Sequence, residues 1–337
     1  MIELNKGAKI FIQCPAGLAT GGPEALHQLG RYLNKIGFNA LMYYVASNHS
    51  DPVHPQYKSY NVPFTFEVEN SSNHLLIIPE SNLYPIYQKA YSRMKKAIWW
   101  LSVSYYWECL EPWKEKIKKK KFYALKSIIN PHINPPLPTP ARLRKLPLYH
   151  IRHSYFSEVF LKSNNISITG KISDYMNAAF FDRVLKNQIK EDIVLYNPKK
   201  NGAFLESIIS KSSHFNWVAV KDLTADGVAD LMNRSKVYVD FGFHPGKERM
   251  PREACIMKCI MIIGRDGSAQ YSEDMPIADV YRFEKNPNKI DEIITLIEDC
   301  FKNYDAHVQN FVSYRAELGE EEQVFEKDIK KVFQYKN

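Results

Sequence analysis

KVYVDFGFHPGKERMPREACIMKCIMIIGRDGS, residues 236–268, alternates between apolar runs and short polar turns. A β-branched and aromatic run at 237–239 ends at Asp240 and predicts a buried strand, and an apolar run at 259–263 predicts another. Between them, Pro251 stands where a first helical residue is tolerated, so a short helix is expected to begin there. The order strand, loop, helix, strand, glycine loop is typical of a parallel α/β sheet, in which ligands bind at the carboxyl ends of the strands.

The turn between these strands is the candidate ligand-binding loop. The N-terminus of a helix offers free N–H groups, and Lys247, Arg249 and Arg252 surround it with positive charge, which together suit a phosphate. Glu253, in the first helical turn, could accept hydrogen bonds from ribose hydroxyls. A plainer interpretation stays open for any one residue: the charges are solvated and Glu253 complements the helix dipole. This interpretation is weaker for the whole stretch, because a turn that contains Pro245 and Gly246 and carries four charges has no evident packing purpose.

Length and composition indicate two domains with substantial cores. The chain has 337 residues, of which 45% are hydrophobic, and domains average about 150 residues. It lacks an apolar run long enough for a membrane span, and its first residues lack a signal-peptide core. The five cysteines are scattered and odd in number, which fits a reducing compartment. Cys255 and Cys259 are interpreted as small core residues and not as zinc ligands.

The net charge of +8 is unevenly distributed along the chain. Residues 1–187 hold 24 Lys and Arg against 12 Asp and Glu, whereas residues 188–337 hold 21 against 25. The basic half predicts an anionic partner: nucleic acid, a membrane surface or an anionic polymer. No nucleic-acid-binding module is recognisable, so nucleic acid is not an expected partner.

A lysine run, KEKIKKKK from Lys114 to Lys121, is the most basic segment of the first half. One interpretation is peripheral contact with an anionic membrane. The other is a solvated helix face over core aromatics. The aromatic residues upstream are Trp99, Trp100, Tyr105, Tyr106, Trp107 and Trp113.

The first half opens with a strand at 9–16, the glycine loop GLATGG at 17–22, and a helix whose apolar residues recur over 26–36. Gly21 and Gly22 let the backbone approach a ligand closely, although the loop is not the GxGxxG dinucleotide fingerprint. Further strands are expected at 39–46, 74–79, 96–103, 123–125 and 148–153, with a helix at 84–94. Ser154 is expected to cap another helix that runs to about Lys162.

A second series of strands and helices begins at 192–196. The loop NPKKNG, residues 197–202, follows that strand and precedes a helix at 204–209. A strand at 217–220 and a helix at 224–234 lead into the stretch quoted first. Helices at 295–301 and 308–333 close the chain. The alternation predicts the α/β class with a parallel sheet in each half.

Four segments, CPAGLATGGPEALHQL, LYNPKKNG, VYVDFGFHPGKERMPREA and IIGRDGSA, together resemble GT-B glycosyltransferases of the bacterial capsule and O-antigen polysaccharide type. The resemblance covers most of the chain, and it is looser between residues 50 and 150. It implies two Rossmann-like domains that face each other, with a nucleotide sugar bound between them. Residues 1–187 would form the acceptor-side domain and residues 188–312 the donor domain. A C-terminal helix at 313–337 would return to the first domain.

The resemblance assigns roles to particular residues. Glu253 matches the glutamate that contacts ribose, and Lys247 and Arg249 match positions near the phosphates. Retaining enzymes of this fold often carry two glutamates eight positions apart, but Pro245 stands eight before Glu253, so retention or inversion stays open. The complete predicted donor-binding set is Gly21, Gly22, Asn197, Lys199, Lys200, His244, Pro245, Gly246, Lys247, Arg249, Arg252, Glu253, Gly267 and Ser268.

Glycosyl transfer requires stabilisation of the charge on the leaving phosphate, which lysine, arginine and backbone N–H groups can supply. The chain lacks an Asp-x-Asp metal motif, so no metal and no cofactor are predicted. An inverting enzyme also needs a base for the acceptor hydroxyl. Glu24, His27 and Glu80 are the candidates by position, and an ordinary loop carboxylate is an equally compatible interpretation of Glu80.

The sequence therefore predicts a cytoplasmic, metal-independent glycosyltransferase of surface polysaccharide biosynthesis. It would move a sugar from a nucleotide sugar to a saccharide or lipid-linked acceptor at the inner face of the cell membrane. Two alternatives stay open: a nucleotide-sugar epimerase or hydrolase of the same fold, and a non-enzymatic protein that binds nucleotides or anionic polymers.

Overall fold

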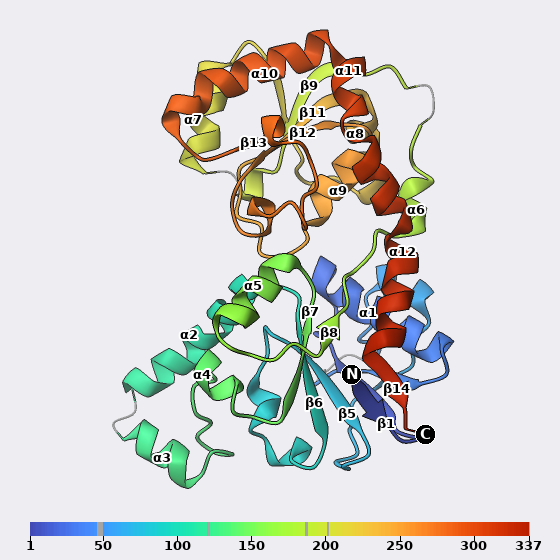
Figure 1. Ribbon diagram of the computed structural model, residues 1–337, viewed down its shortest axis with the longest axis vertical. Helices are drawn as coiled ribbons and strands as arrows, with labels where there is room; N and C mark the ends of the chain where they lie inside the picture. The colour runs from blue at the N-terminus through green and yellow to red at the C-terminus, as the bar shows by residue number, and fades with distance from the viewer. Residues whose placement is uncertain (46–49, 120–121, 186–187, 201, 337) are drawn as a thin grey trace. The chain divides into compact units, whose positions relative to one another are not determined.

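The computed structural model describes residues 1–337 except 46–49, 120–121, 186–187, 201 and 337 (Figure 1). The chain divides into two compact units, described here one at a time. The N-terminal unit comprises Met1–Asp174 and Gln323–Asn337, and the C-terminal unit comprises Tyr175–Glu322. The expected boundary between residues 187 and 188 adjoins 186–187, which lie outside the described residues.

The N-terminal unit contains a seven-stranded parallel sheet of order β4-β3-β2-β5-β6-β7-β8. Its central strands are apolar and buried on both faces, as parallel strands covered by helices must be. The order reverses between β2 and β5, which places a topological switch point at their carboxyl ends. The strands are β2 (Lys9–Gln13), β3 (Asn39–Tyr43), β4 (Phe64–Thr65), β5 (Leu75–Pro79), β6 (Lys95–Trp100), β7 (Leu148–Arg152) and β8 (Gly170–Lys171).

Helices of this unit follow the strands as the sequence indicates. Ser154 caps α5 by accepting a hydrogen bond from the Ser157 N–H, which confirms the predicted cap. Trp99 and Trp100 on β6, together with Tyr106 and Trp113 on α2, are buried in the core. The helices are α1 (Gly21–Lys35), α2 (Val103–Lys119), α3 (Tyr123–Ile129), α4 (Pro140–Leu143) and α5 (Tyr155–Ser163).

The C-terminal unit contains a five-stranded parallel sheet of order β10-β9-β11-β12-β13. The two apolar runs of residues 236–268 are its strands β11 and β12, paired in register from Val237 with Ile260 to Asp240 with Ile263. The order reverses between β9 and β11, so a second switch point lies at their carboxyl ends. The strands are β9 (Glu191–Tyr196), β10 (Asn216–Ala219), β11 (Ser235–Asp240), β12 (Ile260–Gly264) and β13 (Arg282–Phe283).

Helices cover both faces of this sheet, with α7 and α10 on one face and α8 and α9 on the other (Figure 1). Thr224 caps α8 by accepting a hydrogen bond from the Gly227 N–H. The last helix, α12, begins in the C-terminal unit and ends in the N-terminal unit. The helices are α6 (Ala178–Phe181), α7 (Ala203–Lys211), α8 (Ala225–Arg234), α9 (Arg249–Ile256), α10 (Ile290–Lys302), α11 (Tyr304–Gln309) and α12 (Val312–Val332).

The two ends of the chain pair with each other in the N-terminal unit. Strand β1 (Ile2–Leu4) pairs in parallel with β14 (Phe333–Tyr335), and the side chains of Ile2, Leu4 and Phe333 are buried. This pairing was not expected from the sequence, because each strand is only three residues long. None of the helices in the described part of the chain is both long enough and apolar enough to span a bilayer.

Three local expectations were wrong. Residues 84–94 do not form one helix but two 3-10 turns, Tyr84–Ile86 and Lys89–Tyr91, because Gln88 between them has extended backbone. The strand expected at 123–125 is part of α3. This helix begins after Phe122, whose backbone has a φ of 66°. Helix α9 begins at Arg249, two residues before Pro251.

Candidate functional site

Three loops follow the neighbouring strands β9, β11 and β12 at one edge of the C-terminal sheet. Asn197 shapes the first loop, because its side-chain oxygen accepts a hydrogen bond from the Lys199 N–H at 3.1 Å. The second loop lies against the first: a Cβ added to Gly242 would be 2.5 Å from Cβ of Lys200. The structure therefore brings Asn197, Lys199 and Lys200 beside the loop that contains His244, Pro245 and Gly246.

The second and third loops are joined through Gly267. Residues His244 and Gly267 form a parallel β-bridge, and the Ser268 N–H donates to the His244 carbonyl at 2.8 Å. The Ser268 hydroxyl donates to the Gly246 carbonyl at 2.6 Å. Gly267 has a φ of 60°, and a Cβ there would lie 2.1 Å from the His244 carbonyl oxygen. Only glycine fits this approach, so Gly267 and Ser268 hold the second loop in place.

Asp240 and His244 form a buried pair beneath the second loop. Nε2 of His244 lies 3.5 Å from Oδ2 of Asp240, and both side chains are almost fully buried. Asp240 also accepts hydrogen bonds from the Tyr238 hydroxyl at 3.0 Å and the Gly242 N–H at 2.8 Å. Burial alone would raise the pKa of Asp240, but His244, Lys200 and the Gly242 N–H outweigh it and lower this pKa to about 2. Asp240 is thus a carboxylate that orients the loop, and His244 faces it from within the protein.

Carboxylates already pair with four of the predicted cations, Lys200, Lys247, Arg249 and Arg252. Lys247 Nζ lies 2.6 Å from Glu321 Oε1 on α12, and Arg252 Nη1 lies 3.1 Å from Oε2 of the same residue. Arg249 Nε lies 2.7 Å from Glu253 Oε1. Lys200 Nζ lies 2.6 Å from Glu248 Oε2. An anionic ligand would therefore exchange places with carboxylates that already neutralise these cations.

Arg252 and Glu253 occupy the first turns of α9 and are buried. Arg252 donates through Nε to the Glu248 carbonyl at 3.2 Å and through Nη2 to the Lys247 carbonyl at 3.3 Å. It therefore braces the backbone of the loop from behind. Glu253 is paired with Arg249. The Arg249 side chain is 41% exposed, whereas that of Glu253 is 11% exposed.

In the N-terminal unit, the predicted residues lie around the switch point of β2 and β5. Gly21 and Gly22 are the first residues of α1, and a Cβ on Gly22 would approach Leu101 Cδ1 to 3.9 Å. Glu24 follows in the same turn and is buried, and its Oε1 accepts a hydrogen bond from the Tyr60 hydroxyl at 2.8 Å.

His27 is buried one turn further along α1. Its Nδ1 lies 2.7 Å from the Pro23 carbonyl, which can only accept, so Nδ1 carries the proton. Its Nε2 then accepts from the Tyr44 hydroxyl at 2.9 Å. Burial lowers the pKa of His27, while the Pro23 carbonyl opposes that shift. His27 is therefore neutral near pH 7, with both nitrogens engaged inside the unit.

Glu80 follows β5 directly and is buried. Its Oε2 accepts a hydrogen bond from the Leu101 N–H at 2.8 Å. Burial raises the pKa of Glu80 to about 8, although hydrogen bonds from backbone N–H groups, including those of Leu101 and Ser102, work against this rise. A carboxyl group that is protonated near pH 7 can donate a proton, so Glu80 has the chemistry of a general acid in this position.

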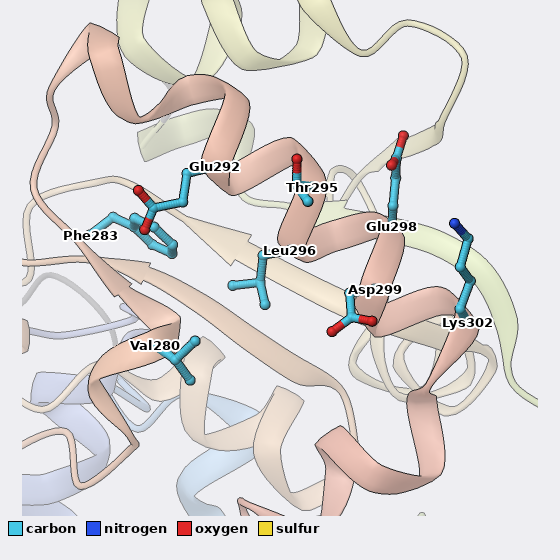
Figure 2. Close-up of a pocket in the computed structure, with 8 residues that line it drawn as sticks. All are labelled: Val280, Phe283, Glu292, Thr295, Leu296, Glu298, Asp299 and Lys302. Carbon is cyan, nitrogen blue, oxygen red and sulfur yellow. The ribbon is translucent and has the colours of Figure 1, made fainter.

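A separate hollow of ≈ 470 Å³ lies between α10 and the residues around β13. Figure 2 shows that its polar side chains all come from α10. Three of them are carboxylates against one lysine, which makes this hollow unsuited to a diphosphate. None of the predicted site residues lines it. Its lining is Val280, Phe283, Glu292, Thr295, Leu296, Glu298, Asp299 and Lys302.

Sequence reasoning missed the acidic partners of the site. Glu321 lies 74 positions from Lys247, in a helix whose run Glu320–Glu321–Glu322 gives no signal for one buried member. Glu248 stands inside the predicted loop and was not assigned a role. Asp240 carried the clearest available signal, since it closes the apolar run at 237–239.

No family model matches the chain, and no curated protein matches it. Several solved structures match the chain over nearly its whole length. Anabaena Alr3699/HepE in complex with UDP-glucose has a TM-score of 0.60 at 12% identity, covering 96% of this chain and 98% of that one. Sucrose-phosphate synthase from Thermosynechococcus elongatus has a TM-score of 0.59 at 12% identity, with the same coverage. WaaG, a glycosyltransferase involved in lipopolysaccharide biosynthesis, has a TM-score of 0.51 at 10% identity, covering 95% of this chain and 99% of that one. The likeness confirms the predicted α/β fold with two Rossmann-like sheets, the GT-B fold.

Proposed function

We propose that this protein is a glycosyltransferase that moves a sugar from a nucleotide-sugar donor to a saccharide or lipid-linked acceptor. The observation that carries the proposal is the set of three joined loops at the ends of β9, β11 and β12. These loops and the start of α9 gather Lys200, Lys247, Arg249 and Arg252 at the switch point of a parallel sheet. Ligands of open α/β sheets bind at such points.

The arrangement suits a leaving nucleoside phosphate. Lysine and arginine side chains on preorganised loops can stabilise the negative charge that develops as the glycosidic bond to phosphate breaks. Lys247 and Arg249 would exchange their present carboxylate partners for phosphate oxygens. Released from Arg249, Glu253 could then accept hydrogen bonds from ribose hydroxyls.

Two solved structures of the same fold support the proposal, the first through its bound donor and the second through its reaction class. The HepE structure contains UDP-glucose, and WaaG is a glycosyltransferase of lipopolysaccharide biosynthesis. Their similarity to this chain concerns the fold. The proposal for this chain therefore rests on its own loop residues, together with Glu24, His27 and Glu80 as candidates for the acceptor side.

The proposal extends to surface polysaccharide biosynthesis in the cytoplasm at the inner face of the membrane, without a metal ion. Phosphate charge would be met by cationic side chains and backbone N–H groups. Glu80, protonated near pH 7, would serve as a proton donor and not as the base.

Thermal unfolding against a panel of UDP-, GDP-, dTDP- and CMP-sugars tests the proposal. A true donor at 100 times its dissociation constant stabilises the folded state by about 2.7 kcal/mol. Lys247→Gln should lower the affinity for that donor about tenfold, because a charge-assisted hydrogen bond is lost. Lys289→Gln is the matched control, since it removes a lysine from an exposed ion pair with Glu292 in the same unit.

Activity then separates the alternatives. Release of nucleoside phosphate that depends on an added acceptor supports transfer, whereas turnover without acceptor indicates a hydrolase or epimerase. The proposal is contradicted if the wild type binds none of these nucleotide sugars. It is also contradicted if the Lys247→Gln variant binds the donor as tightly as the wild type does.

A further inference from the structure

Helix α3 and its flanks expose a group of large apolar side chains. Phe122, Leu125, Ile128, Ile129 and Ile133 are 65%, 56%, 73%, 74% and 74% exposed, and they are called here the α3 surface. Single exposed apolar residues are ordinary, but a group of five within twelve consecutive residues marks a contact surface.

The inner side of α3 is fixed, which keeps the apolar side outward. Tyr123 and Ser127, one helical turn apart, are buried. The Tyr123 hydroxyl donates to the Pro135 carbonyl at 3.0 Å, so the proline-rich segment at 130–140, NPHINPPLPTP, anchors the helix. Leu125, Ile128 and Ile129 lie away from this anchored side and remain open.

The same stretch of the chain is rich in lysine. Residues 103–133 contain seven lysines and three glutamates. Lys114 pairs with Glu111, and Lys118 and Lys119 both pair with Glu115, in exposed contacts that bulk solvent weakens. Lys120 and Lys121 lie outside the described residues. The described residues of this stretch thus hold five lysines against three glutamates.

The aromatic residues upstream of the lysine run contribute less than the sequence suggested. Trp99, Trp100, Tyr106 and Trp113 are buried, whereas Tyr105 and Trp107 on α2 are 51% and 45% exposed. The apolar part of any contact in this region therefore comes chiefly from the α3 surface.

We propose that the α3 surface docks on an anionic lipid bilayer. Its apolar side chains would enter the boundary between headgroups and acyl chains, while the lysines of α2 and Lys126 contact the anionic headgroups. Charge favours this occupant over a second copy of the chain, because two copies would bring their basic segments together. The proposal goes beyond sugar transfer and does not depend on it.

Vesicle co-sedimentation of the full chain tests this docking. Binding is expected to vesicles of phosphatidylcholine and phosphatidylglycerol in equal parts, and to be weak on phosphatidylcholine alone. Ile128→Ser with Ile129→Ser should lower the partition coefficient at least about tenfold, because two apolar insertions are lost. The matched control is Ile189→Ser, an 82% exposed isoleucine of the C-terminal unit, which should bind as the wild type does.

Lys118→Gln with Lys119→Gln should reduce binding by up to about fivefold for each lysine, and salt near 1 M should reproduce that loss. Lys331→Gln, an exposed lysine of α12, is the charge control. Circular dichroism checks that each variant is folded. Three results overturn the proposal: no binding to anionic vesicles, unchanged binding of the Ile128 and Ile129 variant, or equal binding to neutral vesicles. Concentration-dependent dimers that this variant abolishes, without vesicle binding, would assign the surface to a second copy instead.

Discussion

Gly267→Ala is the substitution for which the structure gives the sharpest expectation. The added Cβ would lie 2.1 Å from the His244 carbonyl oxygen and 2.8 Å from its carbonyl carbon. Both are backbone atoms, so no side-chain rotation relieves the contact. The two loops must separate, and separation breaks the hydrogen bonds from Ser268 to the carbonyls of His244 and Gly246.

The size of the effect follows from these losses. An alanine in this backbone region costs about 1–3 kcal/mol, and each lost hydrogen bond about 1 kcal/mol. The free energy of unfolding of the C-terminal unit should therefore fall by roughly 3–5 kcal/mol, which is large for a single methyl group. Affinity for a nucleotide sugar should fall as well, because the loop that carries Lys247 loses its support.

Urea unfolding followed by far-UV circular dichroism measures the change, and Gly37→Ala provides the control. Gly37 also has a positive φ, 94°, but nothing lies within 4 Å of a Cβ there. It should therefore show only the cost of backbone strain, about 1 kcal/mol. If Gly267→Ala is no more destabilising than Gly37→Ala, the close approach of the two loops is refuted.

Two further substitutions address charge. Glu80→Gln should flatten the dependence of the free energy of unfolding on pH. Burial raises the pKa of Glu80 in the folded state from 4.5 to about 8. The wild type therefore loses stability progressively as the pH rises through this range, by a few kcal/mol at most. The urea midpoints of wild type and variant should accordingly diverge as the pH rises from about 4.5 to about 8, with the wild type losing stability relative to the variant. Parallel curves would contradict a buried, protonated Glu80. Glu321→Gln should act in two directions, lowering stability by roughly 2–4 kcal/mol because Arg252 is buried beside it, yet strengthening nucleoside diphosphate binding several-fold because Lys247 is no longer neutralised. Calorimetric titration with UDP measures the second effect, and unchanged or weaker binding would show that Glu321 does not compete with phosphate.

Much of the fold could be predicted because its signals are local. The apolar runs of β11 and β12 and the caps at Ser154 and Thr224 depend on residues within a few positions of each other. The three loops of the candidate site could also be predicted, since parallel strands place their carboxyl ends at one edge. Local signals failed where a single residue broke the pattern, as at Gln88 between two 3-10 turns.

The interior of the site could not be predicted, because it depends on contacts between distant residues. The sequence shows a glycine at Gly267, but not that the His244 carbonyl lies against it. It shows Lys247 as a phosphate-binding candidate, but not that Glu321 on the last helix already holds it. Burial is equally invisible, so His27 and Glu80 carried no sign of their altered pKa values.

Hydrogen exchange with and without a nucleotide sugar tests the central claim most directly. With the sugar that stabilises the protein most, backbone amides of residues 197–200, 242–248 and 265–268 should exchange more slowly, because the three loops close on one ligand. The exchange rates of the amides of α10, beside the hollow of Figure 2, should be unchanged. Protection at α10 with none in the three loops would contradict the account.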